Sequence, residues 1–245
     1  MTRRWRGPVA VLAVVALLVA GAVAGGSWLL RRAGVDTLAP WWGPDCTVLV
    51  AGERVGLDRE QAMAATTAAV RRLRGEAAAD VDGVPPEAVA ALAEGPADGP
   101  GPVLTCFSGS DAELPEEAMG PSGLTPRAET LLAEMTEVHG ELSLGGFQPG
   151  GVSDGHGADS THYRGEAVDV FFRPVSEENR RRGWLLAQWL VAHAERLEVS
   201  VVIFDDRIWS TRFALAGWRP YTSSDVANDI LQHRDHVHVD VRRGT

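Results

Sequence analysis

The chain has 245 residues, of which 45% are hydrophobic, so it is long enough to form one large or two small domains with a substantial core. Its formal net charge is −10, it contains no lysine, and five of its arginines lie within the first 32 residues, so the remainder is more acidic still. Because a nucleic-acid partner requires a basic face, this composition argues against nucleic-acid binding.

Residues 1–32 are predicted to be an N-terminal membrane anchor. Residues 8–30 carry no charge, and as a helix they would extend about 34 Å, enough to cross the hydrocarbon core of a bilayer. Arginines at positions 3, 4 and 6 favour a cytoplasmic N-terminus. The alternative is a cleaved signal peptide of a secreted protein, since Ala22-Val23-Ala24 offers a small-residue cleavage site, but the apolar run continues beyond it. In both cases we expect the body of the protein outside the cytoplasm, most simply as a single-pass protein of the cell membrane.

A short linker over residues 33–45 is predicted to lead into a small α/β module over residues 46–121. Its first twelve residues could form a hairpin. Asp58 and Gln61 then resemble a capping box that opens an Ala-rich helix through about Leu73. The rest of the module is dense in Pro and Gly, with at most one short helix, and carries no recognisable chemistry.

Two cysteines, Cys46 and Cys106, are predicted to form a disulfide that closes this module. An oxidising compartment permits the bond, and an even count leaves no thiol over. The bridge would close a loop of roughly 60 residues and contribute on the order of 3–4 kcal/mol in the chain-entropy model. The alternative, two unrelated buried thiols, fits an extracytoplasmic protein less well.

Residues 122–245 are predicted to form a second domain of the α+β class, with an antiparallel sheet and flanking helices. Thr125 is expected to cap a helix with Pro126 at its first position and Gly140 at its end. The other expected elements are a strand and turn over 145–151, a helix from Ser176 through about Leu197, a hairpin over 199–210 with Asp205-Asp206 near its turn, and a final strand over 236–241.

Several residues of this domain can supply metal ligands. His236 and His238 are two apart on an expected strand, so both side chains point to the same face. His162 and Asp169 are seven apart, which on an unbroken strand would put them on opposite faces. Gly165 between them can break the strand with a turn, and the two side chains can then converge. Two histidines and one aspartate from different segments are a plausible three-ligand set for zinc.

The spacing S-x-H-x-x-G-x-A-x-D at residues 160–169, with a late H-x-H at 236–238, resembles the motifs of a zinc peptidase superfamily. That superfamily includes lysostaphin-type endopeptidases, D-Ala-D-Ala metallopeptidases and hedgehog signalling domains. The resemblance covers roughly residues 122–243 and is closest to the D-Ala-D-Ala carboxypeptidase branch. The whole layout also resembles that of membrane-anchored actinobacterial proteins. The motif positions are Ser160, His162, Gly165, Ala167 and Asp169.

The resemblance implies that His162, Asp169 and His238 hold Zn²⁺, with water as the fourth ligand and with its pKa lowered by the metal. It also places Ser160 near the substrate. Arg164 could contact a substrate carboxylate through its planar guanidinium, although a turn arginine is more often merely solvated.

The catalytic base is left open between two residues. Many carboxypeptidases of this branch have Glu three residues before the last zinc ligand, where this chain has the shorter Asp235. In relatives with H-x-H, the first histidine assists the reaction, and His236 matches it. A nearby base must take a proton from water and pass it to the leaving amine.

The expected function is zinc-dependent hydrolysis of peptide bonds in peptidoglycan stem peptides, of the carboxypeptidase or endopeptidase kind. The alternatives are a non-catalytic zinc-containing binding module of the cell envelope and a structural domain with a metal-free relic of the motif. Asp240 could be a solvated edge residue or could support a metal ligand, and residues 219–232 could form one wall of a substrate groove. The remaining histidines are interpreted as structural, with His233 near the site: His139, His156, His193 and His233.

Overall fold

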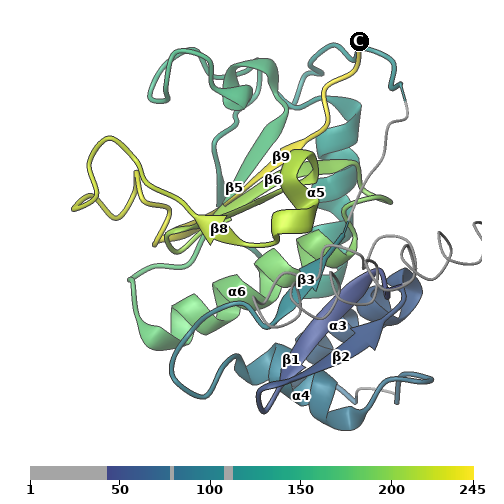
Figure 1. The fold of residues 1–245 in the computed structure, drawn as a ribbon. Coiled ribbons are helices and arrows are strands. Elements are labelled where there is room, and N and C mark those ends of the chain that lie inside the picture. Colours follow the sequence, from purple (N-terminus) through teal and green to yellow (C-terminus); the bar gives the residue numbers. More distant parts are fainter. Residues whose placement is uncertain (1–42, 78–79, 108–112) are drawn as a thin grey trace, which may run out of the picture. The chain divides into compact units, whose positions relative to one another are not determined.

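Residues 43–77, 80–107 and 113–245 are described by a computed structural model of the chain (Figure 1). The predicted membrane anchor and most of the predicted linker lie outside these residues. Within the described ranges, every helix is too short or too polar to cross a membrane. The described residues have the predicted α+β architecture, in which two antiparallel sheets pack against helices.

The smaller sheet contains β1 (Cys46–Val50), β2 (Glu53–Leu57) and β3 (Leu104–Cys106) in the order β2-β1-β3. The predicted hairpin is confirmed, and its turn residues Ala51 and Gly52 have φ values of 49° and 87°, as a tight hairpin turn requires. Cys46 lies directly opposite Cys106 in the β1–β3 register, and the predicted disulfide between them is confirmed.

Two helices cover this sheet, α3 (Arg59–Leu73) and α4 (Pro86–Glu94). The predicted capping box is confirmed, because Asp58 accepts a hydrogen bond from the Gln61 backbone while the Gln61 side chain accepts one from the Asp58 backbone. These bonds satisfy two N–H groups that the first turn of a helix otherwise leaves unpaired.

The larger sheet has six antiparallel strands in the order β4-β5-β9-β6-β7-β8. Its central strand is the last in the chain, and all six of its residues are buried. The predicted final strand and the hairpin are confirmed, with Asp205 and Asp206 in the left-handed region (φ 51° and 63°) at the hairpin turn. The strands are β4 (Leu144–Gly145), β5 (Ala167–Phe171), β6 (Val199–Phe204), β7 (Arg207–Ser210), β8 (Arg219–Pro220) and β9 (His236–Val241).

Two longer helices, α5 (Pro126–His139) and α6 (Glu177–Ala192), pack against this sheet. Two short 3₁₀ helices, η1 (Thr161–Arg164) and η2 (Thr211–Ala216), lie between its strands in the sequence. The predicted cap Thr125 accepts a hydrogen bond from the first turn of α5. Ser176, where the second helix was expected to start, caps α6 in the same way. Helix α6 ends five residues before the predicted Leu197, because the chain turns through Glu198 (φ 54°) to enter β6.

Side chains from α6 and from two tryptophans near β7 and β8 join the two predicted domains through hydrogen bonds. The Gln188 side-chain oxygen accepts from the backbone N–H groups of Val103 and Leu104 at 2.8 and 2.7 Å. The indole N–H groups of Trp218 and Trp209 donate to the carbonyls of β3 at 2.9 and 3.2 Å. The free edge of β3 is therefore satisfied by side chains rather than by another strand, and residues 44–245 form one compact unit. The boundary between residues 121 and 122 stays a prediction.

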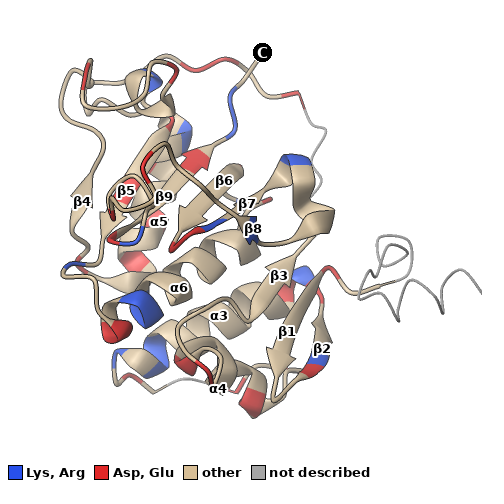
Figure 2. Ribbon diagram, turned by 60° about the vertical axis from the view of Figure 1, so that its left-hand side comes forward, with Lys and Arg blue, Asp and Glu red and all other residues tan. Residues whose placement is uncertain are grey.

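Acidic and basic residues are interspersed over the described ribbon (Figure 2). Some pair across elements, as Arg196 does with Glu134 and Arg59 with Glu195. Such pairs at the surface contribute little individually to stability, so the fold depends mainly on its shared apolar core, which includes Trp184 and Trp189.

His193, at the end of α6, is expected to make the protein less stable in mild acid. Its buried ring stacks on Trp189 and donates from Nδ1 to the Trp189 carbonyl at 2.8 Å. Burial lowers the pKa of His193 to about 4, so between pH 6.5 and 4 the unfolded chain binds a proton that the folded chain does not. Stability is therefore full above about pH 6.5 and falls by on the order of 2 kcal/mol at pH 5.

Urea unfolding at pH 7.5 and pH 5.0, with a chelator to remove metal effects, checks this expectation. The difference in the free energy of unfolding between the two pH values should shrink by about 2 kcal/mol in His193→Gln. An equal difference in the parent and the variant would show that His193 does not cause the acid sensitivity.

Candidate metal centre

The β5–β9 pairing brings an aspartate and two histidines to one part of the larger sheet. Asp169 lies opposite His238, and Phe171 lies opposite His236, in the antiparallel register. His236 and His238 are two residues apart on β9, so they share a face as predicted. Because β9 is the central strand, these side chains are buried rather than at the sheet edge.

His162 reaches the same place from η1, the short helix before β5. Ser160 caps this helix by accepting from the His162 backbone N–H at 3.3 Å. Gly165 ends it in the left-handed conformation (φ 68°), and a Cβ there would lie 2.7 Å from the Gly123 carbonyl oxygen. The predicted break at Gly165 is confirmed, and it lets His162 and Asp169 converge.

Three ligand atoms lie within about one hydrogen-bond distance of one another. His162 Nε2 is 3.1 Å from His238 Nδ1 and 3.4 Å from Asp169 Oδ1, and His238 Nδ1 is 3.0 Å from Asp169 Oδ1. Around a tetrahedral ion with bonds of about 2.0–2.1 Å, ligand atoms are about 3.3 Å apart. The donor set therefore fits a small cation. That these predicted ligands bind a metal stays a prediction.

His156, which was expected from the sequence to have only a structural role, is a further candidate for a metal ligand. One ligand atom each from His156, His162 and Asp169 lie within 4.8 Å of one another. The His156 ring stacks on the His162 ring with centroids 4.1 Å apart. The Tyr163 hydroxyl accepts from the His156 N–H at 3.1 Å and donates to its carbonyl at 2.7 Å. His156 lies in a Gly-rich loop outside the motif, so only its proximity in space reveals this position.

The charges of the cluster favour an ionised aspartate and a cationic histidine before any metal binds. Burial alone would raise the pKa of Asp169, but hydrogen bonds from His162 and His238 outweigh it and hold the pKa well below its usual range. Burial alone would lower the pKa of His238, but the charges of Asp240 and Asp169 and their hydrogen bonds raise it to about 10. A cation that binds at Nδ1 of His238 must therefore displace a proton.

Asp240 supports His238 from the side opposite to Asp169. Its Oδ1 lies 2.8 Å from His238 Nε2 and accepts from the Thr161 hydroxyl at 2.6 Å. Asp240 is 9% exposed on the central strand, so it is not a solvated edge residue. The contact fits the second expectation, support of His238, because a carboxylate at Nε2 orients the imidazole and increases its basicity. That His238 is a metal ligand stays a prediction.

Asp235 and His236 form a second pair beside these residues. Asp235 Oδ1 lies 2.7 Å from His236 Nδ1, and its Oδ2 accepts from Arg173 Nε at 2.7 Å. Both carboxylate oxygens are thus engaged. The other nitrogen of His236, Nε2, lies 3.8 Å from Asp169 Oδ1. In the neutral tautomer in which Asp235 accepts from Nδ1–H, the Nε2 of His236 bears a lone pair on the side of Asp169.

The two residues predicted to bind substrate have other contacts as well. Ser160 caps η1, and its Oγ accepts from the His162 backbone. Arg164 Nε donates to Glu166 at 2.7 Å. Arg164 and Glu166 line a cavity of about 250 Å³ together with Arg127 and Arg243. A substrate role for Ser160 and Arg164 stays a prediction.

His233 also approaches the cluster, from the loop before β9. Its ring centroid lies 4.7 Å from that of His236 and 5.5 Å from that of His238. Burial, together with the charges of His238 and His236, lowers the pKa of His233 to about 3. The sequence predicts that His233 lies near the site as a structural residue, and the structure adds its ring contacts with His236 and His238.

Gly146→Ala is expected to disrupt the cluster directly. Gly146 has φ 78°, and a Cβ there would lie 2.2 Å from His162 Cε1 and 2.9 Å from Asp169 Oδ2. Both side chains are buried and must shift, so we expect metal affinity to fall at least about tenfold, as for other changes that misplace ligands. Gly150→Ala is the matched control, since Gly150 has φ 82° but nothing within 4 Å of the added carbon.

Metal titration of both glycine variants separates backbone strain from displacement of the ligands. Gly150→Ala should lose stability through its positive φ but retain affinity. Equal affinity in both variants would contradict the placement of Gly146 against His162 and Asp169.

Residues 120–231 match the model of a protein family described as "VldE, C-terminal domain". The match spans less than half of the 245-residue chain. It contains His156, His162 and Asp169 but ends before β9, so His236 and His238 lie outside it. Among curated proteins and solved structures, no match to the chain was found.

Proposed function

We propose that the protein is a zinc-dependent peptidase that cleaves peptide bonds in peptidoglycan stem peptides. The observation that carries the proposal is the mutual separation of 3.0–3.4 Å among His162 Nε2, Asp169 Oδ1 and His238 Nδ1. Two imidazoles and one carboxylate are a donor set that suits Zn²⁺ and leaves a fourth position open. The motif resemblance, rather than the family match, supports zinc and the peptidase class.

In this proposal, His162, Asp169 and His238 hold zinc. The chemistry that zinc supplies when bound is Lewis-acid activation of water and of the peptide carbonyl. Asp240 keeps the His238 ring in the orientation that presents Nδ1 to the cation, through the 2.8 Å contact at Nε2.

His236 is assigned the proton transfers. Its Nε2 takes a proton from the attacking water and later returns it to the leaving amine. Asp235 is a positioning residue, because it fixes the Nδ1–H tautomer of His236 and is itself held by Arg173. Two contacts support this choice of His236 over Asp235: Asp235 has both oxygens engaged, whereas Nε2 of His236 lies 3.8 Å from Asp169 Oδ1.

The substrate class rests on the resemblance to D-Ala-D-Ala carboxypeptidases and on the expected location of the chain. The Cys46–Cys106 disulfide suits an oxidising compartment outside the cytoplasm, where peptidoglycan peptides occur. We propose an N-terminal anchor in the cell membrane with the body outside, and a role for Ser160 and Arg164 in holding the peptide or its carboxylate.

A second candidate function is a non-catalytic, zinc-containing binding module of the cell envelope. His156 favours it, because this histidine can offer an additional ligand beside His162 and Asp169. A fourth protein ligand would close the position that a hydrolytic zinc site keeps for water.

Incubation of the zinc-loaded protein with synthetic stem peptides, followed by mass spectrometry of the products, tests the proposal. Cleavage that a chelator abolishes and zinc restores is the expected result. A protein that binds about one zinc but cleaves none of the peptides, and whose His156→Ala variant also cleaves none, would contradict the peptidase and support the binding module.

A further inference from the structure

His233 lies at the end of the loop that connects β8 to β9, beside the residue assigned the proton transfers. Its ring makes a tilted contact with His236 and an edge contact with His238. The ring of Tyr221 contacts it edge-on from the start of the same loop, with centroids 5.1 Å apart. His233 is half-buried rather than exposed, so its ring has a defined place next to the cluster.

The backbone of His233 adopts a conformation that most residues avoid. Its φ is 55°, in the left-handed region, where a side chain with a Cβ is disfavoured. Hydrogen bonds hold the two peptide groups that flank His233. Its N–H donates to the Ile230 carbonyl at 3.1 Å, and its carbonyl accepts from the Asp205 N–H at 2.7 Å. Unfavourable backbone conformations that are held in this way occur preferentially at functional sites.

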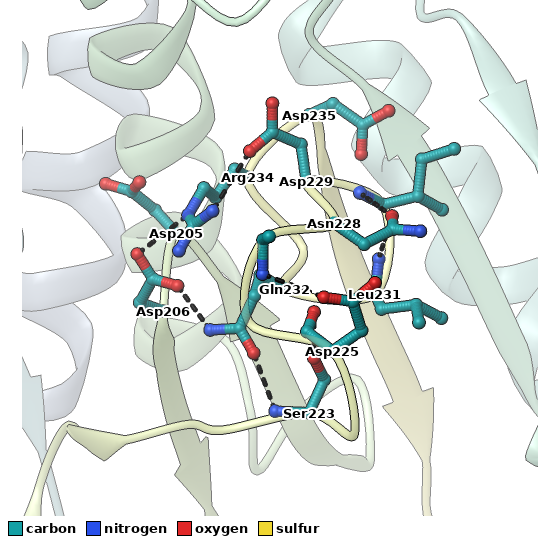
Figure 3. Close-up of polar contacts among 12 residues, drawn as sticks. Asp205, Asp206, Ser223, Asp225, Asn228, Asp229, Leu231, Gln232, Arg234 and Asp235 are labelled. Atoms are coloured by element: carbon teal, nitrogen blue, oxygen red, sulfur yellow. Dashed lines mark hydrogen bonds and ion pairs between the residues drawn. The ribbon is translucent and has the colours of Figure 1, made fainter.

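The two neighbours of His233 fasten the loop to the β6–β7 turn, as Figure 3 shows. Gln232 donates to Asp206 and accepts from the Ser223 backbone, and Arg234 donates to Asp206 at 3.0 Å and to Asp229 at 3.0 Å. The loop therefore holds the His233 ring in place before any ligand arrives, which is the preorganisation that a binding residue needs.

The hydrogen bonding of the ring leaves one nitrogen for a ligand. His233 Nδ1 lies 3.1 Å from the Leu231 carbonyl oxygen, which can only accept, so Nδ1 carries the hydrogen. In the neutral ring, Nε2 then bears a lone pair. Among the described residues, none donates a hydrogen bond to this nitrogen. The ring that carries this acceptor lies against the ring of His236, with centroids 4.7 Å apart.

We infer that His233 is a substrate-binding residue whose Nε2 accepts a hydrogen bond from the N–H of the peptide bond to be cleaved. The inference rests on the proposed peptidase function. A peptide bond that leaves water loses the hydrogen bonds of both its carbonyl and its N–H. In this inference, the cation at the metal-ligand cluster interacts with the peptide carbonyl, and His233 accepts a hydrogen bond from the N–H. The two interactions together orient the peptide bond toward His236.

A comparison of an amide with its ester analogue tests this hydrogen bond alone. The probes are N-acetyl-L-Lys-D-Ala-D-Ala and the same compound ending in D-lactate, in which an ester oxygen replaces the scissile N–H. The ratio of kcat/KM for amide over ester is measured in the zinc-loaded parent and in His233→Asn and His233→Gly, which both tolerate the left-handed backbone. Intrinsic reactivity cancels when the ratios are compared.

We expect the amide-to-ester ratio to fall by about 3- to 10-fold in both variants, the effect of one lost hydrogen bond. Ile230→Ala, at an exposed position of the same loop, should leave the ratio unchanged. An active parent whose ratio is retained in the His233 variants would overturn the inference and leave the peptidase intact. Loss of zinc from both variants would overturn it as well, by assigning His233 to the structure of the site. A parent that neither binds nor cleaves either probe would overturn the proposed function and this inference together.

Discussion

Replacing His162 or His238 by alanine is expected to abolish stoichiometric zinc binding. The parent protein should contain about one zinc per chain, and each variant should bind it more than about 100-fold more weakly, since even changes to the groups around a ligand cost roughly 10–100-fold. The reason is that each variant retains only two of the three predicted protein ligands, namely Asp169 and one histidine. Metal content by mass spectrometry and zinc titration against a competing chelator measure both quantities.

His139→Gln is a suitable control for these ligand variants. His139 ends α5 and contacts Trp189 edge-on, with ring centroids 5.4 Å apart, and has no contact with the cluster among the described residues. It should retain the parent affinity. Parent protein that stays free of metal after zinc is supplied and the excess removed would remove the basis of the peptidase proposal and leave a structural domain.

His236→Ala is expected to abolish most hydrolysis while leaving the zinc in place. General acid–base groups contribute about 10²–10⁴-fold to rates, so kcat should fall by that amount on a stem peptide, whereas zinc content stays near one per chain. His236 supplies none of the three ligand atoms around the predicted cation position, although its Nε2 lies 3.8 Å from one of them, Asp169 Oδ1. Single-turnover rates together with metal content separate the two effects.

Asp235→Asn is the informative partner of that variant. If Asp235 positions His236, the neutral amide weakens both the His236 and the Arg173 contacts, and kcat should fall by roughly 10–100-fold, less than in His236→Ala. The double variant should then be no slower than His236→Ala alone. A larger loss in Asp235→Asn than in His236→Ala would instead make Asp235 the base.

The elements with local causes could be predicted from the amino-acid sequence. The Asp58–Gln61 capping box and the Thr125 cap each satisfy N–H groups within one helical turn, so their residues identify the helix start without tertiary contacts. The hairpin turn at Asp205-Asp206 and the shared face of His236 and His238 follow from strand geometry alone.

The sequence likewise predicted that His162 and Asp169 converge, because Gly165 between them can break a strand. The structure has this break at Gly165 and places His162 Nε2 3.4 Å from Asp169 Oδ1 and 3.1 Å from His238 Nδ1. The end of α6 was less predictable: the apolar pattern continues to Leu197, but the helix stops where the chain must turn into β6.

The surroundings of these residues could not be predicted, because they depend on contacts between distant segments. Whether Asp240 is a solvated edge residue depends on the place of β9 in the sheet, which non-adjacent strands determine. The proposed preference for His236 over Asp235 rests on the Arg173 contact, and the candidacy of His156 rests on its stack with His162 and its hydrogen bonds with Tyr163. The β3 edge is satisfied by Gln188, more than 80 residues away. Local patterns encode caps, turns and the face of a strand, whereas these contacts arise from packing between segments that are distant in the chain.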